Sequence, residues 1–306
     1  MDSIRTNLSA MVALRTLQDT NVELGKVQSR ISTGYRIAEA KDNAAYWAIA
    51  TTMRSDHKAL STVQDALGLG SAKIDITYTA LNSAIDVVDE IKSRIVAARE
   101  PGVDKTKIQD EIFSLQGQLQ AIASSASFSG ENWLSVDSAS ANYSQIKSIV
   151  ASFNRTSTGV QIETIDIDTA TLELFDAADQ SGIADSVFTT TGAGAVTVSL
   201  TTLDVTAAGL DYTDLDDMIS AVDAHLAQLT SSASDAGAIK KRISMQTDFV
   251  KVLLDTIDVG SGTLIDADIS KESTRLQALQ TQQQLGIQAL SIANSSAQNI
   301  LALFRQ

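Results

Sequence analysis

Residues 53–95 read MRSDHKALSTVQDALGLGSAKIDITYTALNSAIDVVDEIKSRI. In this stretch an apolar residue returns at every seventh position without a break, namely at Met53, Leu60, Leu67, Ile74, Leu81, Val88 and Ile95. An unbroken seven-residue repeat is typical of a long α-helix that supercoils against partner helices. Tyr46 extends the series by one step, so the helix would be roughly 75 Å long at 1.5 Å per residue. Glu100-Pro101-Gly102 should end it, because proline disfavours helical geometry in the preceding residue.

Apolar residues with helical spacing continue on both sides of this segment. A second helix is expected at about residues 105–124, with one face formed by Ile108, Ile112, Leu115, Leu119 and Ile122. Near the N-terminus apolar residues recur by threes and fours, and near the C-terminus two heptad series interleave over residues 265–304. Small and polar residues occupy several core positions of these terminal seams. We therefore expect the terminal helices to be weak alone and to need partners in order to become ordered.

The middle of the chain is predicted to contain β-strands. Val160 and Ile162 alternate with polar residues, whereas Ile165 and Ile167 alternate in the other phase, so a bulge or turn is expected near Glu163-Thr164. A second alternating run follows Gly192 and Gly194 and consists of Val196, Val198 and Leu200. Helical spacing then resumes at Asp214, which we expect to cap that helix, and a separate last helix is predicted at about residues 238–257.

The charge of the chain is concentrated in this middle part. The formal net charge is −14, and residues 156–239 contain 14 Asp and Glu but no Lys or Arg. Like charges without partners repel one another and are costly to bury, so this stretch is expected to be solvated. The sequence shows no basic surface of the kind that binds nucleic acid, so we expect no nucleic-acid partner.

Composition argues against an enzyme, a cofactor site or a metal site. The chain has no Cys and only two histidines, His57 and His225, which excludes disulfides and cysteine catalysis. No glycine-rich phosphate loop or zinc-binding histidine pair occurs, and the acids around Asp211 lack the glycine and distal glutamate of a calcium loop. No apolar run approaches 18 residues, so no membrane association is expected. The adjacent Tyr46 and Trp47 are interpreted as packing anchors or, alternatively, as a subunit contact.

Two segments near the ends of the chain resemble a known family. Residues 28–50 read QSRISTGYRIAEAKDNAAYWAIA and are similar to the N-terminal signature of bacterial flagellins. Residues 293–301, ANSSAQNIL, resemble the closing motif of the same family, although Ala297 replaces its usual proline. The resemblance covers about residues 1–135 and 238–306 and is closest to rhizobium-like flagellins of the alphaproteobacteria.

This resemblance implies a mainly α fold built from long antiparallel helices. Residues 1–38 and 268–306 would form a terminal coiled-coil domain that lines a filament lumen. Residues 39–172 and 211–267 would form a helical spoke domain with a β-hairpin, and residues 173–210 a small, acidic, β-rich outer insert. The insert is expected to be the outermost part of the filament, where solvent screens its charge.

The implied function is that of a structural subunit which assembles into the extracellular flagellar filament for swimming. The implied partners are other copies of the chain, either alone or mixed with other flagellins, and the export apparatus, chaperone, cap and junction proteins of the flagellum. Export would occur unfolded through the flagellar type III channel. A hook–filament junction protein of the same superfamily and a secreted helical effector remain as alternatives.

Two groups of residues are singled out on this basis. Assembly is expected to depend on the apolar seam residues Ile4, Leu8, Met11, Leu17, Leu24, Ile31, Ile269, Leu276, Leu279, Leu290, Ile300 and Phe304. A second group occupies positions that immune receptors read in flagellins. Residues 30–50 correspond to the peptide that the plant receptor reads, and the group there comprises Arg30, Gly34, Tyr35, Arg36, Asp42, Asn43 and Tyr46. The vertebrate Toll-like receptor reads an Arg and, four residues on, a Leu in the long helix, and the register that we propose places Glu90 and Arg94 at those two positions. Several of these, including Tyr35, Asn43 and Tyr46, differ from the usual family residues, so reduced immune recognition is expected.

Overall fold

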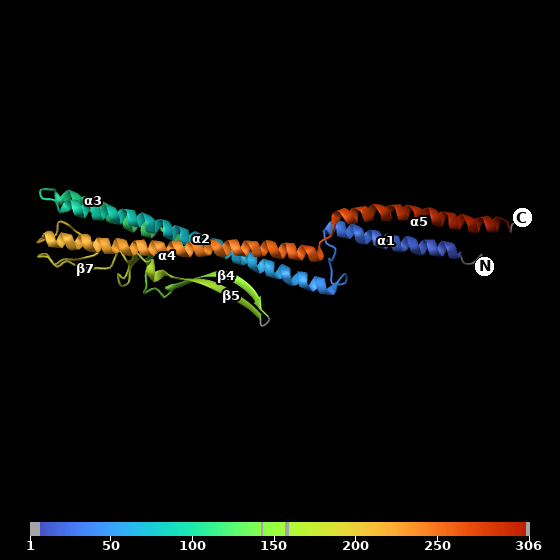
Figure 1. Ribbon diagram of the computed structural model, residues 1–306, viewed down its shortest axis with the longest axis horizontal. Coiled ribbons are helices and arrows are strands. Elements are labelled where there is room, and N and C mark those ends of the chain that lie inside the picture. The colour runs from blue at the N-terminus through green and yellow to red at the C-terminus, as the bar shows by residue number, and fades with distance from the viewer. Residues whose placement is uncertain (1–6, 142, 157–158, 304–306) are drawn as a thin grey trace. The chain divides into compact units, whose positions relative to one another are not determined.

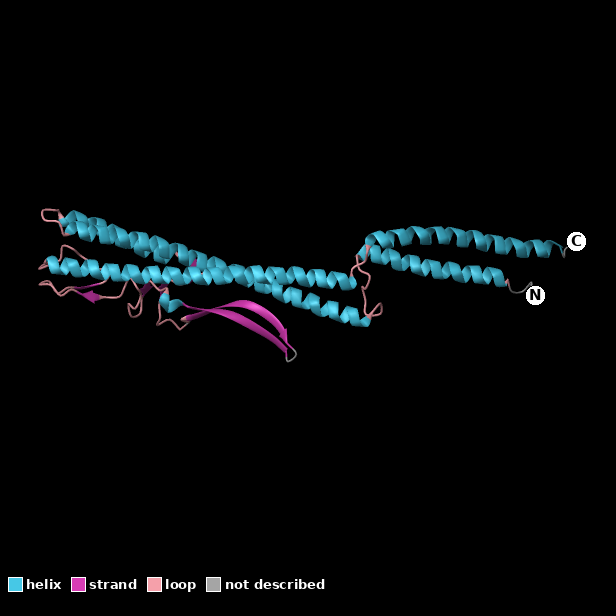
Figure 2. Ribbon diagram, in the orientation of Figure 1, coloured by secondary structure: helices cyan, strands magenta, loops and turns pink. Residues whose placement is uncertain are grey.

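The computed structural model describes residues 7–141, 143–156 and 159–303, with side chains as far as residue 295. Five α-helices dominate this part of the chain (Figures 1 and 2), which confirms the mainly α fold class. They are α1 (Leu8–Thr33), α2 (Ala44–Ala98), α3 (Lys105–Ser125), α4 (Tyr212–Ile265) and α5 (Ile269–Leu303). Among the described helices, none has an apolar stretch long enough to cross a bilayer.

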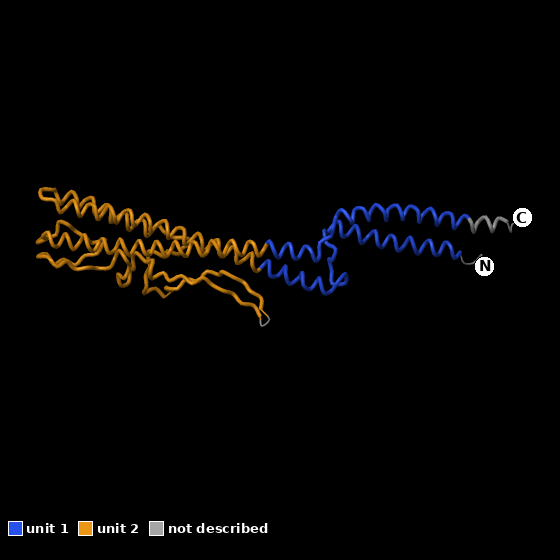
Figure 3. Tube along the Cα trace, in the orientation of Figure 1, with its two compact units in different colours: residues 1–58, 255–306 blue, residues 59–254 orange. Residues whose placement is uncertain are grey.

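The chain divides into two compact units (Figure 3). Unit 1 comprises residues 1–58 and 255–306, and unit 2 comprises residues 59–254. Their limits lie inside α2 and α4, which each contribute to both units. The domain limits expected from the sequence, near residues 38 and 268, lie instead in the segments that join α1 to α2 and α4 to α5. Those domain limits stay a prediction.

The core of unit 2 follows the seven-residue repeat. Leu60, Leu67, Ile74, Leu81, Val88 and Ile95 are at most 2% exposed. Unit 2 also buries apolar side chains of α3 and α4, which include Ile112, Leu119, Leu215 and Val222. The predicted long helix is therefore confirmed, and its first turn is capped by Asn43, whose Oδ1 accepts hydrogen bonds from the N–H groups of Ala45 and Tyr46.

Helix α4 corrects two expectations. It is continuous, whereas the sequence predicts a break near residues 230–237. The small residues there stay helical because Ser232, Ala233 and Ala236 are buried, and Gly237 lies against the ring of Tyr78. The expectation that Asp214 is the N-cap is wrong, because α4 begins at Tyr212 and Asp214 lies inside its first turn, so Asp211 holds the cap position. Asp211 Oδ1 accepts from the Asp214 N–H at 2.9 Å, and Asp214 Oδ2 accepts from the Asp211 N–H at 3.1 Å, so the two form a reciprocal capping box.

The strands form four two-stranded sheets in the described residues. The largest is the antiparallel hairpin of β4 (Ile146–Thr156) and β5 (Gly159–Asp168). The expected irregularity near Glu163-Thr164 is present, but the bulge lies opposite them on β4, between Val150 and Ser152. Because β5 itself is regular, its two apolar phases lie on opposite faces: Ile165 and Ile167 are buried, whereas Val160 and Ile162 are exposed.

The other three sheets are short. Strand β1 (Ser127–Phe128) pairs antiparallel with β2 (Glu131–Asn132), and β3 (Ser135–Val136) pairs parallel with β6 (Phe175–Asp176). Strand β7 (Phe188–Thr189) pairs antiparallel with β8 (Thr197–Val198). Residues 173–210 therefore consist of turns and two-residue strands, held to the helices by a few apolar side chains that include Leu174, Leu200 and Leu203.

The expectation that the acidic stretch is solvated is wrong for three of its carboxylates. Glu173, Asp176 and Asp214 are each at most 5% exposed. Donors from the chain replace water around them: the Tyr143 hydroxyl donates to Glu173 at 2.7 Å, and the N–H groups of Ser138 and Ala178 donate to Asp176. The Thr190 hydroxyl, with backbone N–H donors, outweighs burial and lowers the pKa of Asp214 to about 2.

Candidate functional site

The paired terminal helices of unit 1 are the candidate functional site. Helices α1 and α5 lie side by side and antiparallel (Figure 1). Four polar contacts join them in one register. Asn7 Nδ2 donates to the Ala293 carbonyl at 2.9 Å, Gln283 Nε2 donates to Asn21 Oδ1 at 2.7 Å, Arg275 pairs with Glu23 at 3.0 Å, and Arg30 pairs with Glu272 at 3.3 Å.

Local sequence defines the limits of α1. Asn7 caps its start by accepting from the Ala10 N–H at 3.0 Å, and Gly34 ends it with φ 76°, a conformation that favours glycine. On its surface the ammonium of Lys26 hydrogen-bonds Glu23 and, with a further contribution from Arg275, lowers the pKa of that carboxyl. Glu23 therefore pairs with one cation on its own helix and with one on α5.

The pair buries very little of its own apolar surface. Val27 is the only buried residue of α1, and Glu272 and Leu279 are the only buried residues among the described side chains of α5. Apolar side chains that are 45–74% exposed remain on both helices: Leu8, Met11, Val12, Leu14, Val22, Ile269, Leu285, Ile287 and Ile292. A helix pair with so small a core is not expected to be stable without further partners.

The predicted assembly residues fall into two groups. Leu279 is buried, and Leu17, Leu24, Ile31, Leu276 and Leu290 are half-buried, whereas Leu8, Met11 and Ile269 are exposed. Ile4 and Phe304 lie outside the described residues, as does the side chain of Ile300. The heptad seam thus marks mainly the contact within one chain. It misses Val12, Val22, Leu285, Ile287 and Ile292, which a search for apolar residues outside the seam would have found.

The signature motif forms the joint between α1 and α2. Gly34 accepts through its carbonyl from the Ala267 N–H at 2.8 Å, and Tyr35 forms an isolated bridge with Asp266. The guanidinium of Arg36 donates to the Leu264 carbonyl at 2.8 Å. Ile37 packs in a small core with Ala50 and Ile265. These residues therefore tie the chain after α1 to the segment that joins α4 to α5.

The rest of the motif is held by short-range contacts. Asp42 accepts through Oδ2 from the N–H groups of Ala38 and Glu39, both at 3.2 Å. Tyr46 and Trp47 are 43% and 36% exposed, so the interpretation of these residues as packing anchors within the chain is wrong. Their exposure favours the alternative, a contact with another subunit.

Glu90 and Arg94 lie on α2 in unit 2. Their side chains form an ion pair one helical turn apart, and the Arg94 Nε also lies 3.0 Å from Glu111 on α3. The register proposed for the immune-receptor site therefore carries two charged side chains that are already paired. Within the described residues no group of three or more His, Asp or Glu side chains is placed to hold a metal ion.

Comparison with known proteins gives a consistent result. The N-terminal helical region of bacterial flagellins matches residues 4–139, and the C-terminal helical region matches residues 219–304. Flagellin C of Rhizobium meliloti (strain 1021) is 53% identical over 324 aligned positions, and a flagellin of Brucella melitensis is 44% identical over 306, with both chains of each pair covered completely. Among solved structures, a Bacillus cereus flagellin superposes with a TM-score of 0.40 at 16% identity, covering 62% of this chain and 88% of that one.

Proposed function

The chain belongs to the bacterial flagellin family and is a structural component of the extracellular flagellar filament, and we propose that its α1–α5 pair supplies the surface through which copies polymerise. The observation that carries the proposal is the apolar surface of this pair. It includes Val12 and Val22 on α1 and Leu285 and Ile292 on α5, all exposed in the single chain. Burial of this surface between neighbouring copies would give the helices the core that they lack.

The low stability of the isolated α1–α5 pair would suit both export and assembly. A helix pair that is marginal alone can pass unfolded through a narrow flagellar type III channel and become ordered when neighbouring copies cover it. The absence of Cys means that no disulfide has to form or break on the way. The proposed further partners are the export apparatus, the chaperone, the cap and junction proteins, and other flagellins in the same filament.

The hook–filament junction protein remains the alternative function. Similarity over the full chain to proteins named flagellin supports the filament assignment. Electron microscopy of purified protein after seeding separates the two, because a filament subunit should grow long filaments and a junction protein should not. Short, capped or absent polymers from wild-type protein would favour the alternative.

Substitutions on the exposed surface test the assembly proposal. Val22→Asp and Ile292→Asp should leave the helical content of the monomer unchanged, because both side chains are in solvent there. Each should abolish polymerisation or raise the critical concentration at least tenfold, since assembly would bury an unpaired carboxylate. Leu24→Asp and Leu290→Asp should also block polymerisation, but through the contact within the chain. Gln18→Asp, at an exposed polar position of α1, is the matched control. Normal filaments from both Val22→Asp and Ile292→Asp would disprove the proposed surface.

We propose in addition that this flagellin is read poorly by immune receptors. Asn43 lacks the charge of the usual Asp, and exposed Tyr46 stands where the family usually has glycine, so its ring would hinder close approach to the backbone. Glu90 and Arg94 would present an ion pair to the vertebrate receptor. A peptide of residues 29–50 on plant cells, and monomer on receptor-expressing mammalian cells, should each be at least tenfold less potent than a consensus flagellin. Equal potency would refute the idea.

A further inference from the structure

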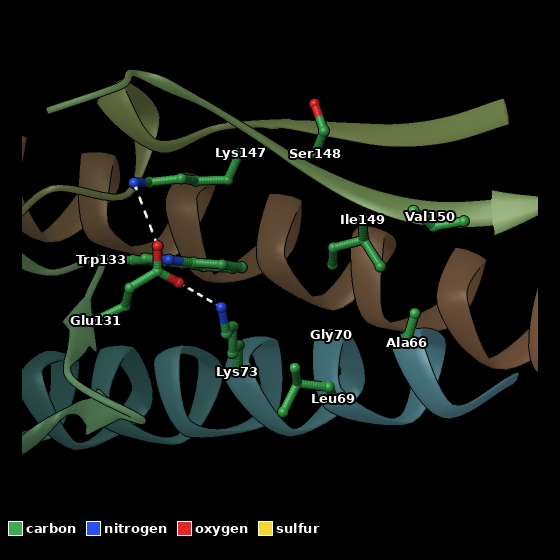
Figure 4. Close-up of a pocket in the computed structure, with 10 residues that line it drawn as sticks. All are labelled: Ala66, Leu69, Gly70, Lys73, Glu131, Trp133, Lys147, Ser148, Ile149 and Val150. Carbon is green, nitrogen blue, oxygen red and sulfur yellow. Dashed lines mark hydrogen bonds and ion pairs between the residues drawn. The ribbon is translucent and has the colours of Figure 1, made fainter. Parts of the chain in front are cut away.

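An open cavity of about 230 Å³ lies in unit 2, between α2 and strands β2 and β4. Figure 4 shows that its lining has two different ends. One end is apolar and is formed by Ala66, Leu69, Gly70, Ile149 and Val150. The other end brings together Lys73, Glu131, Trp133 and Lys147, which come from three separate elements and the segment after β2.

The polar end has one positive charge more than it has negative charges. The Lys73 ammonium pairs directly with Glu131, and the Lys147 Nζ lies 3.6 Å from the same carboxylate. Their side chains are only 22% and 25% exposed. The hydrogen bond from Lys73, aided by Lys147, outweighs burial and lowers the pKa of Glu131, so its carboxylate stays charged. Among the described residues that line the cavity, a single carboxylate therefore serves two half-buried ammonium groups.

Trp133 supplies an independent observation. Its side chain is 4% exposed, and its Nε1–H is buried without a hydrogen-bond acceptor among the described residues. Figure 4 shows the indole between the side chains of Lys73 and Lys147. A buried donor without an acceptor costs free energy, so an acceptor that entered the polar end would be favoured.

We propose that this cavity binds a small monocarboxylate with a short apolar tail, such as butyrate. The ligand carboxylate accepts hydrogen bonds from the Trp133 Nε1–H and the Lys147 ammonium, and it neutralises the excess positive charge. The tail packs against Leu69, Ile149 and Val150. Pockets of this kind combine an apolar wall with a few converging polar groups, and those groups fix the orientation of the ligand. The inference does not depend on the filament function, because the site lies wholly within unit 2.

Intrinsic fluorescence offers a direct test, because the chain has only two tryptophans, Trp47 and Trp133. In unassembled full-length protein carrying Trp47→Phe, Trp133 is the single reporter. Titration with sodium butyrate at constant ionic strength should give a saturable change with a Kd on the order of 1–10 mM, as expected for a ligand of so few atoms. The indole N–H resonance should move downfield as it gains an acceptor. Butyramide, which has the same tail and no charge, should bind at least tenfold more weakly.

Two lysine variants complete the design. Lys147→Met should raise the Kd for butyrate at least tenfold, whereas Lys107→Met, at a position on α3 that is 82% exposed and outside the cavity, should leave the Kd unchanged. The proposal is overturned if butyrate causes no saturable change, or if sodium chloride causes the same change. It is equally overturned if Lys147→Met binds butyrate as tightly as the unsubstituted protein, because the excess ammonium is the group that selects the anion.

Discussion

The side-chain amide of Gln283 on α5 donates a 2.7 Å hydrogen bond to Asn21 Oδ1 on α1. Both are polar residues at positions of the terminal heptad seams that are mostly occupied by apolar residues. A polar pair at a seam position lowers stability but fixes register, since any slip of the helices would separate the two groups. The terminal pair is thus aligned by polar contacts more than by a core.

Replacing both residues with leucine should relax this register. The chain has no native Cys, so an engineered pair at Leu17 and Gly286 can report it: a Cβ built at Gly286 would lie 3.9 Å from the Leu17 Cβ, within the range for a disulfide. We expect rapid Leu17→Cys/Gly286→Cys cross-linking in the native background. In the Asn21→Leu/Gln283→Leu background, cross-linking of Leu17→Cys with Ala289→Cys, one helical turn further along α5, should rise at least several-fold. An unchanged cross-linking pattern would show that other contacts set the register.

Two glycines of α2 should respond oppositely to the same substitution. A Cβ at Gly70 would lie 2.5 Å from Ile149 Cδ1 and 2.7 Å from its Cγ2, whereas nothing lies within 4 Å of a Cβ at Gly68. Gly68→Ala should therefore stabilise the chain by about 0.5–1 kcal/mol through helix propensity. Gly70→Ala should cost about 1–3 kcal/mol by overpacking, partly offset by that same gain. Urea unfolding of the two variants measures both effects. Stabilisation by Gly70→Ala would mean that the β4–β5 hairpin is loosely docked on α2.

The helical core could be predicted because the same seven-residue apolar repeat runs through the whole of it. Residues seven apart from Leu60 to Ile95 face the same partners, so a run of apolar residues at that spacing gives the buried side chains directly. The second helix was expected from about residue 105 on the spacing of its apolar residues, and α3 begins at Lys105, where Asp104 caps it by accepting from the Thr106 N–H.

Other features could not be predicted, because they depend on tertiary contacts between segments that are distant in the sequence. The small residues around Ser232 read as a break, and they are helical only because α4 buries them against other elements. The bulge on β4 is invisible in β4 itself and becomes evident only when its register against β5 is known. The exposed surface of Val22 and Ile292 was missed because periodicity identifies residues that share a face, and says nothing about which faces remain uncovered.

His225 should make unit 2 less stable in mild acid. Burial lowers its pKa, partly offset by a hydrogen bond with Gln228, and the ring lies 6.1 Å from that of Phe188. Because the folded state disfavours the imidazolium, the unfolded state binds more protons as pH falls through about 6.5, and stability decreases below that value. Urea unfolding between pH 7.5 and 5 should show this loss. His225→Gln should flatten the pH dependence of the unfolding free energy between pH 7.5 and 5. An equal slope in wild type and His225→Gln would exclude His225 as the cause.

The acidic segment of residues 173–210 is fastened to α3 by two glutamines. Gln116 is buried, and its Nε2 donates at 3.0 Å to the carbonyls of both Leu200 and Leu203. Gln109 donates to the Leu203 carbonyl at 3.1 Å and accepts from the Val205 N–H at 2.9 Å. Side-chain amides of a neighbouring helix thus position this part of the segment, in addition to its buried apolar side chains.

Gln116→Met should release this part of the segment while keeping the volume of the side chain. The change leaves the carbonyls of Leu200 and Leu203 with one donor fewer in a buried place, which should cost about 1–3 kcal/mol for each group left unsatisfied. Urea unfolding should report the loss of stability, and limited proteolysis should cut near residues 199–205 several-fold faster than in wild type. Gln118→Met, at an exposed position of the same helix, should change the free energy of unfolding by no more than about 0.5 kcal/mol and the cleavage rate by no more than about twofold.

In Gln116→Met the Gln109 side chain still binds the Leu203 carbonyl, so the cut sites should appear first on the Leu200 side. Cleavage no faster than in the Gln118→Met control would mean that the apolar contacts of Leu200 and Leu203 hold the segment without the amide.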